Sequence, residues 1–292
     1  MQAHVALGVS VLVALALGSA VVVTSGVVTR RAMEGASEDL AAARRAFGQL
    51  ADSRGREASV QAGLIASLPV FRAHLTEPEL SADEPTLDAL ADQYRTQVNA
   101  AFLVVGSRRS SVTGRSGWPG EALSNAVQQS LRDAIGGVPT RRVAAIDGTL
   151  HLVVAEPARF ADEVLGALVV GYRLDDAVVR ELAAITQCEI TLAAGPVLSA
   201  SSLGPRERDD LAQLLRSGGA READSPAVRA VGAGEYVTAA YPLMPDAESG
   251  DEGRLVLLQD WRPTRQSLRE MRLQLALGGV VIFAAALAGA LL

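Results

Sequence analysis

The sequence predicts an α+β fold: a long N-terminal helix and two tandem modules, each with an antiparallel five-stranded sheet, flanked by two transmembrane helices. Three observations predict it. Apolar segments of membrane-spanning length lie at both ends of the 292 residues. Apolar side chains recur at helical spacing over residues 30–76. The remaining residues hold one order of strands and helices twice, which indicates two copies of one module.

Two apolar segments are long enough to cross a bilayer. Val5–Val23 is uncharged and follows no basic residue, so it is predicted to be an uncleaved signal anchor rather than a cleaved signal peptide. Leu275–Leu292 is the second predicted span, and because the chain ends inside it we expect a fragment of a longer protein. Four arginines follow the first span and would place the middle of the chain in the cytoplasm, whereas a long folded domain translocates regardless of charge.

One long helix is predicted over residues 30–76. Two apolar stretches share its register, with three polar residues between them: Leu40, Ala43, Phe47 and Leu50; Leu64, Leu68, Phe71 and Leu75; Arg54, Glu57 and Gln61. This pattern suits a helix that meets different partners along its length, and a core-facing helix of one domain is equally open. Pro69 is expected to bend or interrupt the helix. A second helix is predicted over Thr86–Ala100.

The first module is predicted to run from Ala101 to Tyr172. Asp147-Gly148, between two apolar runs, is a strong signal for a hairpin. Gly136-Gly137 is expected to end a helix. The expected elements are strands at 101–106 and 110–115, a helix at Glu121–Ile135, strands at 141–146 and 149–156, and a closing strand at Val164–Tyr172.

The second module repeats that order. Its hairpin residues Ala233-Gly234 follow Asp147-Gly148 by 86 positions, and Gly253 follows Gly166 by 87. The expected elements are strands at 188–194 and 197–202, a helix at Pro205–Arg216, strands at 227–232, 235–242 and 253–261, and a helix from Pro263. A helix between the modules, with Asp175 as its N-cap, is expected to couple the two sheets.

Composition excludes several classes of function. The chain has no lysine, so Schiff-base and P-loop chemistry are absent. The net charge of -6 argues against nucleic-acid binding, which needs a basic surface. The three histidines do not have metal-ligand spacing. Cys188, the single cysteine, is expected to be a small buried apolar side chain. We therefore expect no enzyme, catalytic residue, metal or cofactor.

The predicted layout resembles the double Cache sensors of bacterial transmembrane receptors, in which two PAS-like modules follow a long helix. The resemblance covers most of residues 30–275 and includes GALVVGYRLDDAVVREL, where a closing strand is followed by Leu-Asp-Asp and a helix. It implies an anchor at 1–29, helices at 30–100, a membrane-distal module with its linking helix at 101–186, a membrane-proximal module at 187–262, and a juxtamembrane helix with a truncated span at 263–292.

The resemblance also implies a binding site in the first module. Polar and aromatic side chains at the matching places are Arg115, Trp118, Arg142, His151 and Tyr172. Arginine beside aromatic rings suits a small anionic or zwitterionic solute. Amino-acid-binding members carry an aspartate at the end of the closing strand, where this chain has Gly171 and Tyr172, so an amino-acid ligand is not expected. For each residue, a core or solvated position is equally open.

We therefore expect a sensor in the inner membrane, with residues 30–272 in the periplasm. It would bind a small solute, form a homodimer, and signal through the second span to an output domain beyond this chain. The alternative is a membrane-anchored structural or assembly protein whose modules bind a partner protein. A polar-lined cavity in the first module would favour the sensor, and a solid module with a large exposed apolar patch would favour the alternative.

Overall fold

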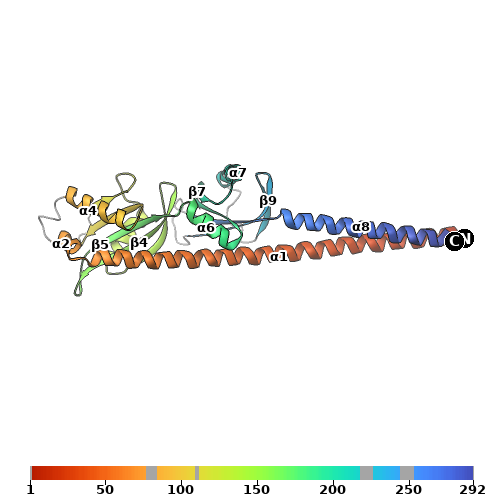
Figure 1. Ribbon diagram of the computed structural model, residues 1–292, viewed down its shortest axis with the longest axis horizontal. Coiled ribbons are helices and arrows are strands. Elements are labelled where there is room, and N and C mark those ends of the chain that lie inside the picture. The colour runs from red at the N-terminus through yellow and green to blue at the C-terminus, as the bar shows by residue number, and fades with distance from the viewer. Residues whose placement is uncertain (1, 77–83, 109–111, 218–225, 244–252, 292) are drawn as a thin grey trace.

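The computed structural model describes residues 2–76, 84–108, 112–217, 226–243 and 253–291. For residues 2–17, 20–21 and most of those beyond 281, it describes the backbone alone. Helix α1 (Gln2–Ser67) runs along the whole length of the molecule, and two sheets lie one after the other beside it. Helix α8 (Arg262–Leu291) returns alongside α1, so the described chain begins and ends at the same end of the molecule (Figure 1).

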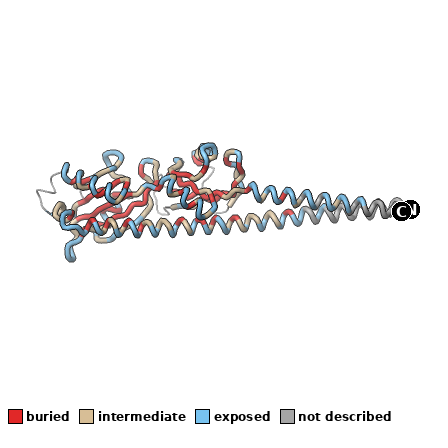
Figure 2. Tube along the Cα trace, viewed as in Figure 1, coloured by how far each residue is buried: buried red, intermediate tan, exposed pale blue. Residues whose placement is uncertain are grey.

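The inward face of α1 carries a line of buried residues in two stretches, 36–47 and 55–66, mostly at steps of three and four, with the half-buried Leu50 and Ala51 between the stretches. Most residues of the stretch beside the first sheet are glycine or alanine, and Figure 2 shows buried positions along α1 beside both sheets. The line consists of Ala36, Leu40, Ala43, Phe47, Gly55, Ala58, Ala62, Ile65 and Ala66. Because the side chains beside the first sheet are small, the helix backbone can approach that sheet closely. The first predicted apolar seam is confirmed at Leu40, Ala43 and Phe47, whereas the second is wrong at Leu64 and Leu68, which are exposed.

Leu64 and Leu68 lie on the outer face of the chain at this point, not in the core. Leu64 is 63% exposed and Leu68 is 40% exposed. Leu64 follows Leu40 by 24 residues, and at 3.6 residues per turn it faces about a third of a turn away from the core side. The interruption at Pro69 is confirmed: α1 ends at Ser67, and α2 (Pro69–Thr76) begins there, with Phe71 buried.

The first sheet has the strand order β2-β1-β5-β4-β3 and is antiparallel throughout. It is preceded by α4 (Glu84–Gln97), which packs on β1 and β2. The elements are β1 (Phe102–Ser107), β2 (Val112–Ser116), α5 (Asn125–Ile135), β3 (Thr140–Ile146), β4 (Thr149–Phe160) and β5 (Glu163–Arg173). The predicted helix from Glu121 begins four residues late, at Asn125, with Ser124 as its extended N-cap.

The second sheet has the corresponding order, β7-β6-β10-β9-β8, so the predicted repeat is confirmed. Its elements are β6 (Glu189–Ala194), β7 (Val197–Ser201), α7 (Pro205–Arg216), β8 (Ala227–Val231), β9 (Gly234–Pro242) and β10 (Gly253–Asp260). Both first hairpins also carry an irregularity at the same place, between Val105 and Gly106 in one and between Leu192 and Ala193 in the other.

The hairpin turns show one error in the predicted alignment. In the first module Asp147 and Gly148 both have positive φ, at 49° and 69°, as the Asp-Gly signal predicts. In the second module the turn is Gly232-Ala233, one residue before the predicted Ala233-Gly234. Gly232 supplies the positive φ, at 61°, and Gly234 already belongs to β9.

Each sheet is covered on both faces. One core lies between the sheets and α1 and is shared by both modules. A second lies between the first sheet and α5, and a third between the second sheet and α7. This layering follows from strands that are apolar on both sides, such as β4 and β5. The fold class is therefore α+β with a long N-terminal helix and two antiparallel five-stranded sheets, as predicted.

The helix α6 (Asp176–Thr186) joins the two modules and contacts both α1 and the second sheet. Asp175 is its N-cap, as predicted, and its carboxylate accepts hydrogen bonds from the backbone N–H groups of Ala177 and Val178. Arg54 of α1 forms an ion pair with Glu181 at 2.7 Å. The connection is thus a packed helix, and the modules are not joined by a free linker.

Within the part of the chain whose side chains are described, no helix combines the length and the apolar character that a membrane crossing requires. The predicted spans Val5–Val23 and Leu275–Leu292 fall largely on residues whose side chains lie outside that part. The prediction of two flanking spans is therefore not confirmed.

Candidate functional site

Four of the five predicted site residues lie on or beside the α5 face of the first sheet. Trp118 packs edge-on against Phe102, with ring centroids 4.8 Å apart, and its indole N–H donates to the carbonyl of Ala122 at 3.1 Å. The His151 ring also contacts Phe102, with ring centroids 5.6 Å apart. Phe102 is buried, and Trp118 and His151 both pack against its ring.

The space at the centre of this group is filled by side chains. A Cβ on Gly171 would lie 2.0 Å from the Phe102 ring, and one on Gly106 would lie 2.7 Å from the Leu131 side chain. Both strands therefore need glycine there because ring and leucine side chains occupy the room above them. The residues predicted to line a pocket, Trp118 and His151, contribute to a packed core on this face.

The two arginines of the predicted site, Arg142 and Arg115, already have polar partners. Arg142 forms an ion pair with Asp133 of α5 at 2.8 Å. The guanidinium of Arg115 donates to the carbonyl of Glu121 at 2.6 Å. Arg142 is therefore held by α5, and Arg115 by the segment before α5. Both guanidinium groups use donors in contacts within the protein, which disfavours a role in binding a solute.

His151 is buried, and burial lowers its pKa from the usual value near 6.5. The nearby Arg173 guanidinium acts in the same direction, while a contact between Nδ1 and the carbonyl of Thr149, 3.2 Å away, acts against it. The imidazole is therefore neutral at pH 7, and this side chain offers no cation to an anionic solute.

Tyr172 lies on the opposite face of the sheet, toward α1, and so does not join the other four. Its hydroxyl is 3.4 Å from the Gln61 Oε1 atom, and burial together with the Glu57 carboxylate raises its pKa to about 12. It lines a hollow of about 310 Å³ between α1 and the first module, next to Arg54 and Asn99. Tyr172 is therefore a neutral hydrogen-bonding group in this hollow.

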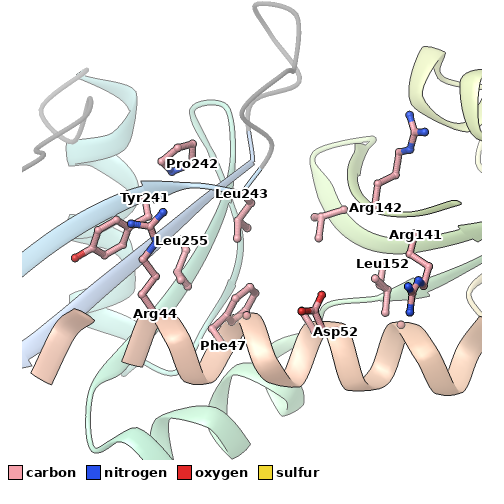
Figure 3. Close-up of a pocket in the computed structure, with 14 residues that line it drawn as sticks. Arg44, Phe47, Asp52, Arg141, Arg142, Leu152, Tyr241, Pro242, Leu243 and Leu255 are labelled. Atoms are coloured by element: carbon pink, nitrogen blue, oxygen red, sulfur yellow. The ribbon is translucent and has the colours of Figure 1, made fainter. Parts of the chain in front are cut away.

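A second hollow, of about 410 Å³, is a cleft between the two modules. Helix α1 forms its floor, the strands β3 and β4 form one wall, and β9 and β10 with the residue that follows β9 form the other (Figure 3). We call it the inter-module cleft; the residues that line it include Arg44, Phe47, Asp52, Gly55, Arg141, Val143, Leu152, Tyr241, Leu243 and Leu255. Arg142 also borders it, but its side chain points away from that of Arg141 (Figure 3).

Sequence reasoning missed this cleft because its walls come from three distant parts of the chain. In the sequence, Arg44 is one of the four arginines that follow the first predicted span, and Tyr241 is an aromatic residue of the second module. Arg141 stands next to the predicted Arg142, and strand alternation places the two on opposite faces of the sheet. The alternation along β3 and the helical periodicity of α1 are the sequence features that could have indicated the cleft.

Metal and thiol chemistry find no support in the described part of the chain. No group of three histidine, cysteine or acidic side chains there is placed to hold a metal ion. Cys188 is buried, and burial together with the Asp39 and Glu189 carboxylates raises its pKa to about 11. Its thiol is therefore protonated and shielded at pH 7, which makes it a poor nucleophile.

No family model matches the chain, and no curated protein matches it. Solved structures similar to it include the periplasmic domain of Vibrio cholerae LuxQ, with 16% identity, a TM-score of 0.46, and coverage of 75% of this chain and 99% of that one. The sensor domain of the V. cholerae histidine kinase DctB matches with 16% identity, a TM-score of 0.48, and coverage of 79% and 98%.

The ligand-binding domain of the Campylobacter jejuni chemoreceptor Tlp3, in complex with L-valine, matches with 12% identity, a TM-score of 0.47, and coverage of 80% and 95%. The three are sensory or periplasmic domains of bacterial proteins, the class that the sequence resemblance indicated. At these identities and TM-scores the likeness does not bear on the ligand of this chain.

Proposed function

We propose that this chain is the ligand-sensing region of a bacterial transmembrane receptor. Residues 30–272 lie outside the cytoplasm in this proposal, the two terminal segments cross the inner membrane, and α8 passes a displacement to an output domain beyond the second span. The chain itself performs no catalysis. The ligand is a small solute of anionic character.

The observation that carries this proposal is the arrangement of α1 and α8. A single helix, α1, contacts both sheets and then runs beside α8, which begins directly after the last strand of the second sheet. Trp261 joins the second sheet to α8. Its backbone N–H donates to the carbonyl of Glu235 in β9 at 2.8 Å, and its own carbonyl accepts from the backbone N–H of Arg265 in α8. A shift of either sheet along α1 would therefore reach the paired helices directly.

Further contacts support transmission between the modules. The Asp176 carboxylate accepts hydrogen bonds from the Ser201 backbone N–H at 2.9 Å and from Arg208 of α7 at 2.7 Å, so α6 is fixed to the second module. The backbone N–H of Leu150 in the first module donates to Ser199 Oγ in the second at 2.8 Å. A change in the first module would thus be communicated through packed and hydrogen-bonded elements.

The proposal includes a homodimer formed through the outer face of α1. Val60 and Leu64 are 64% and 63% exposed and lie one helical turn apart, with Leu68 and Val70 exposed beyond them. We call these four residues the outer seam. Exposed aliphatic side chains at the end of α1 and the start of α2 suit pairing with the same surface of a second copy.

The outer seam also favours the second candidate function, a structural or assembly protein that binds a partner through its modules. The filled α5 face of the first module points the same way, since a solid module was the feature expected of such a protein. The inter-module cleft favours the sensor instead. The two candidates differ in whether the rotational phase of α8 affects any output.

Insertions in α8 test the sensory role without knowledge of the ligand. The chain is joined at its C-terminus to a cytoplasmic output module with a measurable activity. One residue inserted after Ser267 rotates the following helix by about 100°, and seven inserted residues make almost two whole turns. We expect the single insertion to change the basal output strongly and the seven-residue insertion to restore most of it.

An equal output from all three chimeras would contradict coupling through a rigid helix and would favour the partner-binding alternative. The location is tested separately by reporter fusions after Gly250. A reporter that is active only in the periplasm is expected to work there. Activity of a cytoplasmic reporter at that site, with a silent periplasmic one, would overturn the proposed topology.

A further inference from the structure

The inter-module cleft holds two arginines, Arg44 and Arg141, that form no ion pair with an acid among the described residues. We propose that this cleft, and not the interior of the first module, is the binding site for a small organic monoanion with an apolar body. This inference rests on the sensory role proposed above and specifies where its ligand binds and to which chemical class that ligand belongs.

Two guanidinium groups supply the positive charge, one on α1 and one on β3. Arg44 lies over the ring of Tyr241, 4.5 Å from the ring centroid. This cation–π contact fixes the guanidinium by its face and leaves its N–H edge free to donate. Arg141 forms no ion pair with any residue in the described part of the chain.

The side chain of Arg141 lies over Gly55 of α1. A Cβ on Gly55 would lie 3.5 Å from the Arg141 Cδ atom and 3.9 Å from the Leu152 Cδ1 atom, which is ordinary van der Waals contact. The aliphatic stem of Arg141 thus lies on α1, at the floor of the cleft (Figure 3). An alanine would fit at position 55, whereas a much larger side chain would compete with the Arg141 stem for this place.

The rest of the lining is apolar. Phe47, Leu152 and Leu255 are buried, and Val143 and Leu243 are half-buried at the two walls. A volume of about 410 Å³ is within the range of pockets for small molecules. A ligand that places an apolar body against these side chains would release water from them, and its acid group would reach the arginines.

Asp52 restricts the charge of the ligand. It is exposed on the α1 floor, and its carboxylate has no ion-pair partner among the described residues (Figure 3). With Arg142 held by Asp133, the described residues that line the cleft carry two positive charges and one negative charge without an ion-pair partner. One unit of net positive charge suits a monoanion, and Asp52 would repel the second charge of a dianion.

The occupant would contact both modules at once. Arg141 and Leu152 belong to the first sheet, and Tyr241 and Leu255 to the second. A ligand that bridges these walls favours one angle between the modules over α1, because its differential affinity for the bridged arrangement shifts the population toward it.

Calorimetric titration of the full chain in detergent micelles tests this proposal. The probes are 3-phenylpropionate, its neutral counterpart 3-phenylpropionamide, and the dianion succinate. We expect the monoanion to bind and the other two to bind at least about tenfold more weakly. Arg141→Gln and Arg44→Gln each remove a charged donor, and each should weaken 3-phenylpropionate binding by at least about tenfold.

Two further variants keep the result interpretable. Asp52→Asn is an exposed substitution that removes the opposing charge, and it should tighten 3-phenylpropionate binding several-fold, a gain that loss of folding cannot produce. Arg115→Gln alters an arginine of the predicted first-module site and should leave the affinity unchanged. Thermal unfolding without probe checks that each variant folds.

The outcomes separate this proposal from the sensory role. Unchanged affinity in Arg141→Gln and Asp52→Asn, with a loss in Arg115→Gln, would move the site into the first module and overturn the inter-module proposal while leaving the sensor intact. Failure of the wild-type chain to bind 3-phenylpropionate would overturn the proposed ligand class at this cleft. The α8 insertion chimeras, which need no ligand, would still decide the sensory role.

Discussion

Gly171 lies directly beneath the ring of Phe102: a Cβ on Gly171 would be 2.0 Å from the Phe102 Cε1 atom. By the sequence resemblance, Gly171 and Tyr172 stand where amino-acid-binding relatives carry an aspartate at the end of the closing strand. At Gly171 the Phe102 ring fills the place where such a side chain would stand. This contact favours the expectation that the ligand is not an amino acid held by an aspartate at Gly171.

Gly171→Ala is expected to destabilise the protein. The added methyl group must displace a fully buried ring, and overpacking of this kind costs about 1–3 kcal/mol. Thermal unfolding in detergent measures the effect. Gly48→Ala is the control, because Gly48 is exposed in α1 with open space around it, and alanine there should stabilise by up to about 1 kcal/mol. Equal behaviour of the two variants would contradict the described packing.

Leu64→Gln is expected to weaken self-association without unfolding the chain. Leu64 is 63% exposed, so the monomer loses little from the change, whereas a paired outer seam loses a buried leucine on each helix. Sedimentation analysis in detergent should show the dimer dissociation constant rising by at least about tenfold. Ile185→Gln, equally exposed on α6 and outside the seam, should have no effect. A dimer unaffected by Leu64→Gln would exclude the outer seam as its interface.

Stability is expected to decline as the pH falls from about 7 to 5, in part through His151. Burial lowers the pKa of this imidazole, so the unfolded chain binds a proton near pH 6.5 that the folded chain takes up only at lower pH. The contribution is therefore fully present above the unfolded pKa and is lost as the pH falls toward the folded one. Denaturant unfolding of His151→Leu should show a shallower decline over this range, and an identical decline would argue against a neutral buried imidazole.

Cys188 is expected to react with thiol reagents only when the protein opens. Its pKa is raised to about 11, chiefly by burial, so both access and thiolate content are low at pH 8. Labelling with a disulfide reagent should be slow in the native protein and fast in denaturant. Because the chain has one cysteine, the rate reports a single site. Rapid complete labelling of the native protein would show that the strand β6 is accessible.

The secondary structure and the repeat could be predicted because they depend on local patterns. Short apolar runs, the Asp147-Gly148 turn and the Asp175 cap each determine a few neighbouring backbone angles, and the structure confirms all three. The register of α1 could not be predicted in the same way. Its inward line passes through Gly55, Ala58 and Ala62, which look unremarkable in sequence and matter only because a sheet lies against them.

The candidate site was harder to predict than the fold. Polar and aromatic residues in one module suggested a pocket, but whether such residues enclose space depends on neighbours such as Phe102 and Leu131. The inter-module cleft arises only when α1 brings Arg44 near the wall that holds Arg141. Long-range placement of that kind leaves no local pattern in the chain.

The return of α8 beside α1 determines which motions of the protein can change the relative position of the two helices. Because both helices leave the molecule at the same end and touch one another, any tumbling or tilting of the body as a whole carries their ends together and leaves their separation unchanged. Only a change inside the body, such as a different angle between the two sheets, can slide one helix past the other. In the proposed receptor, the two helices would therefore slide past one another only in response to a change inside the body, and not in response to motion that both share.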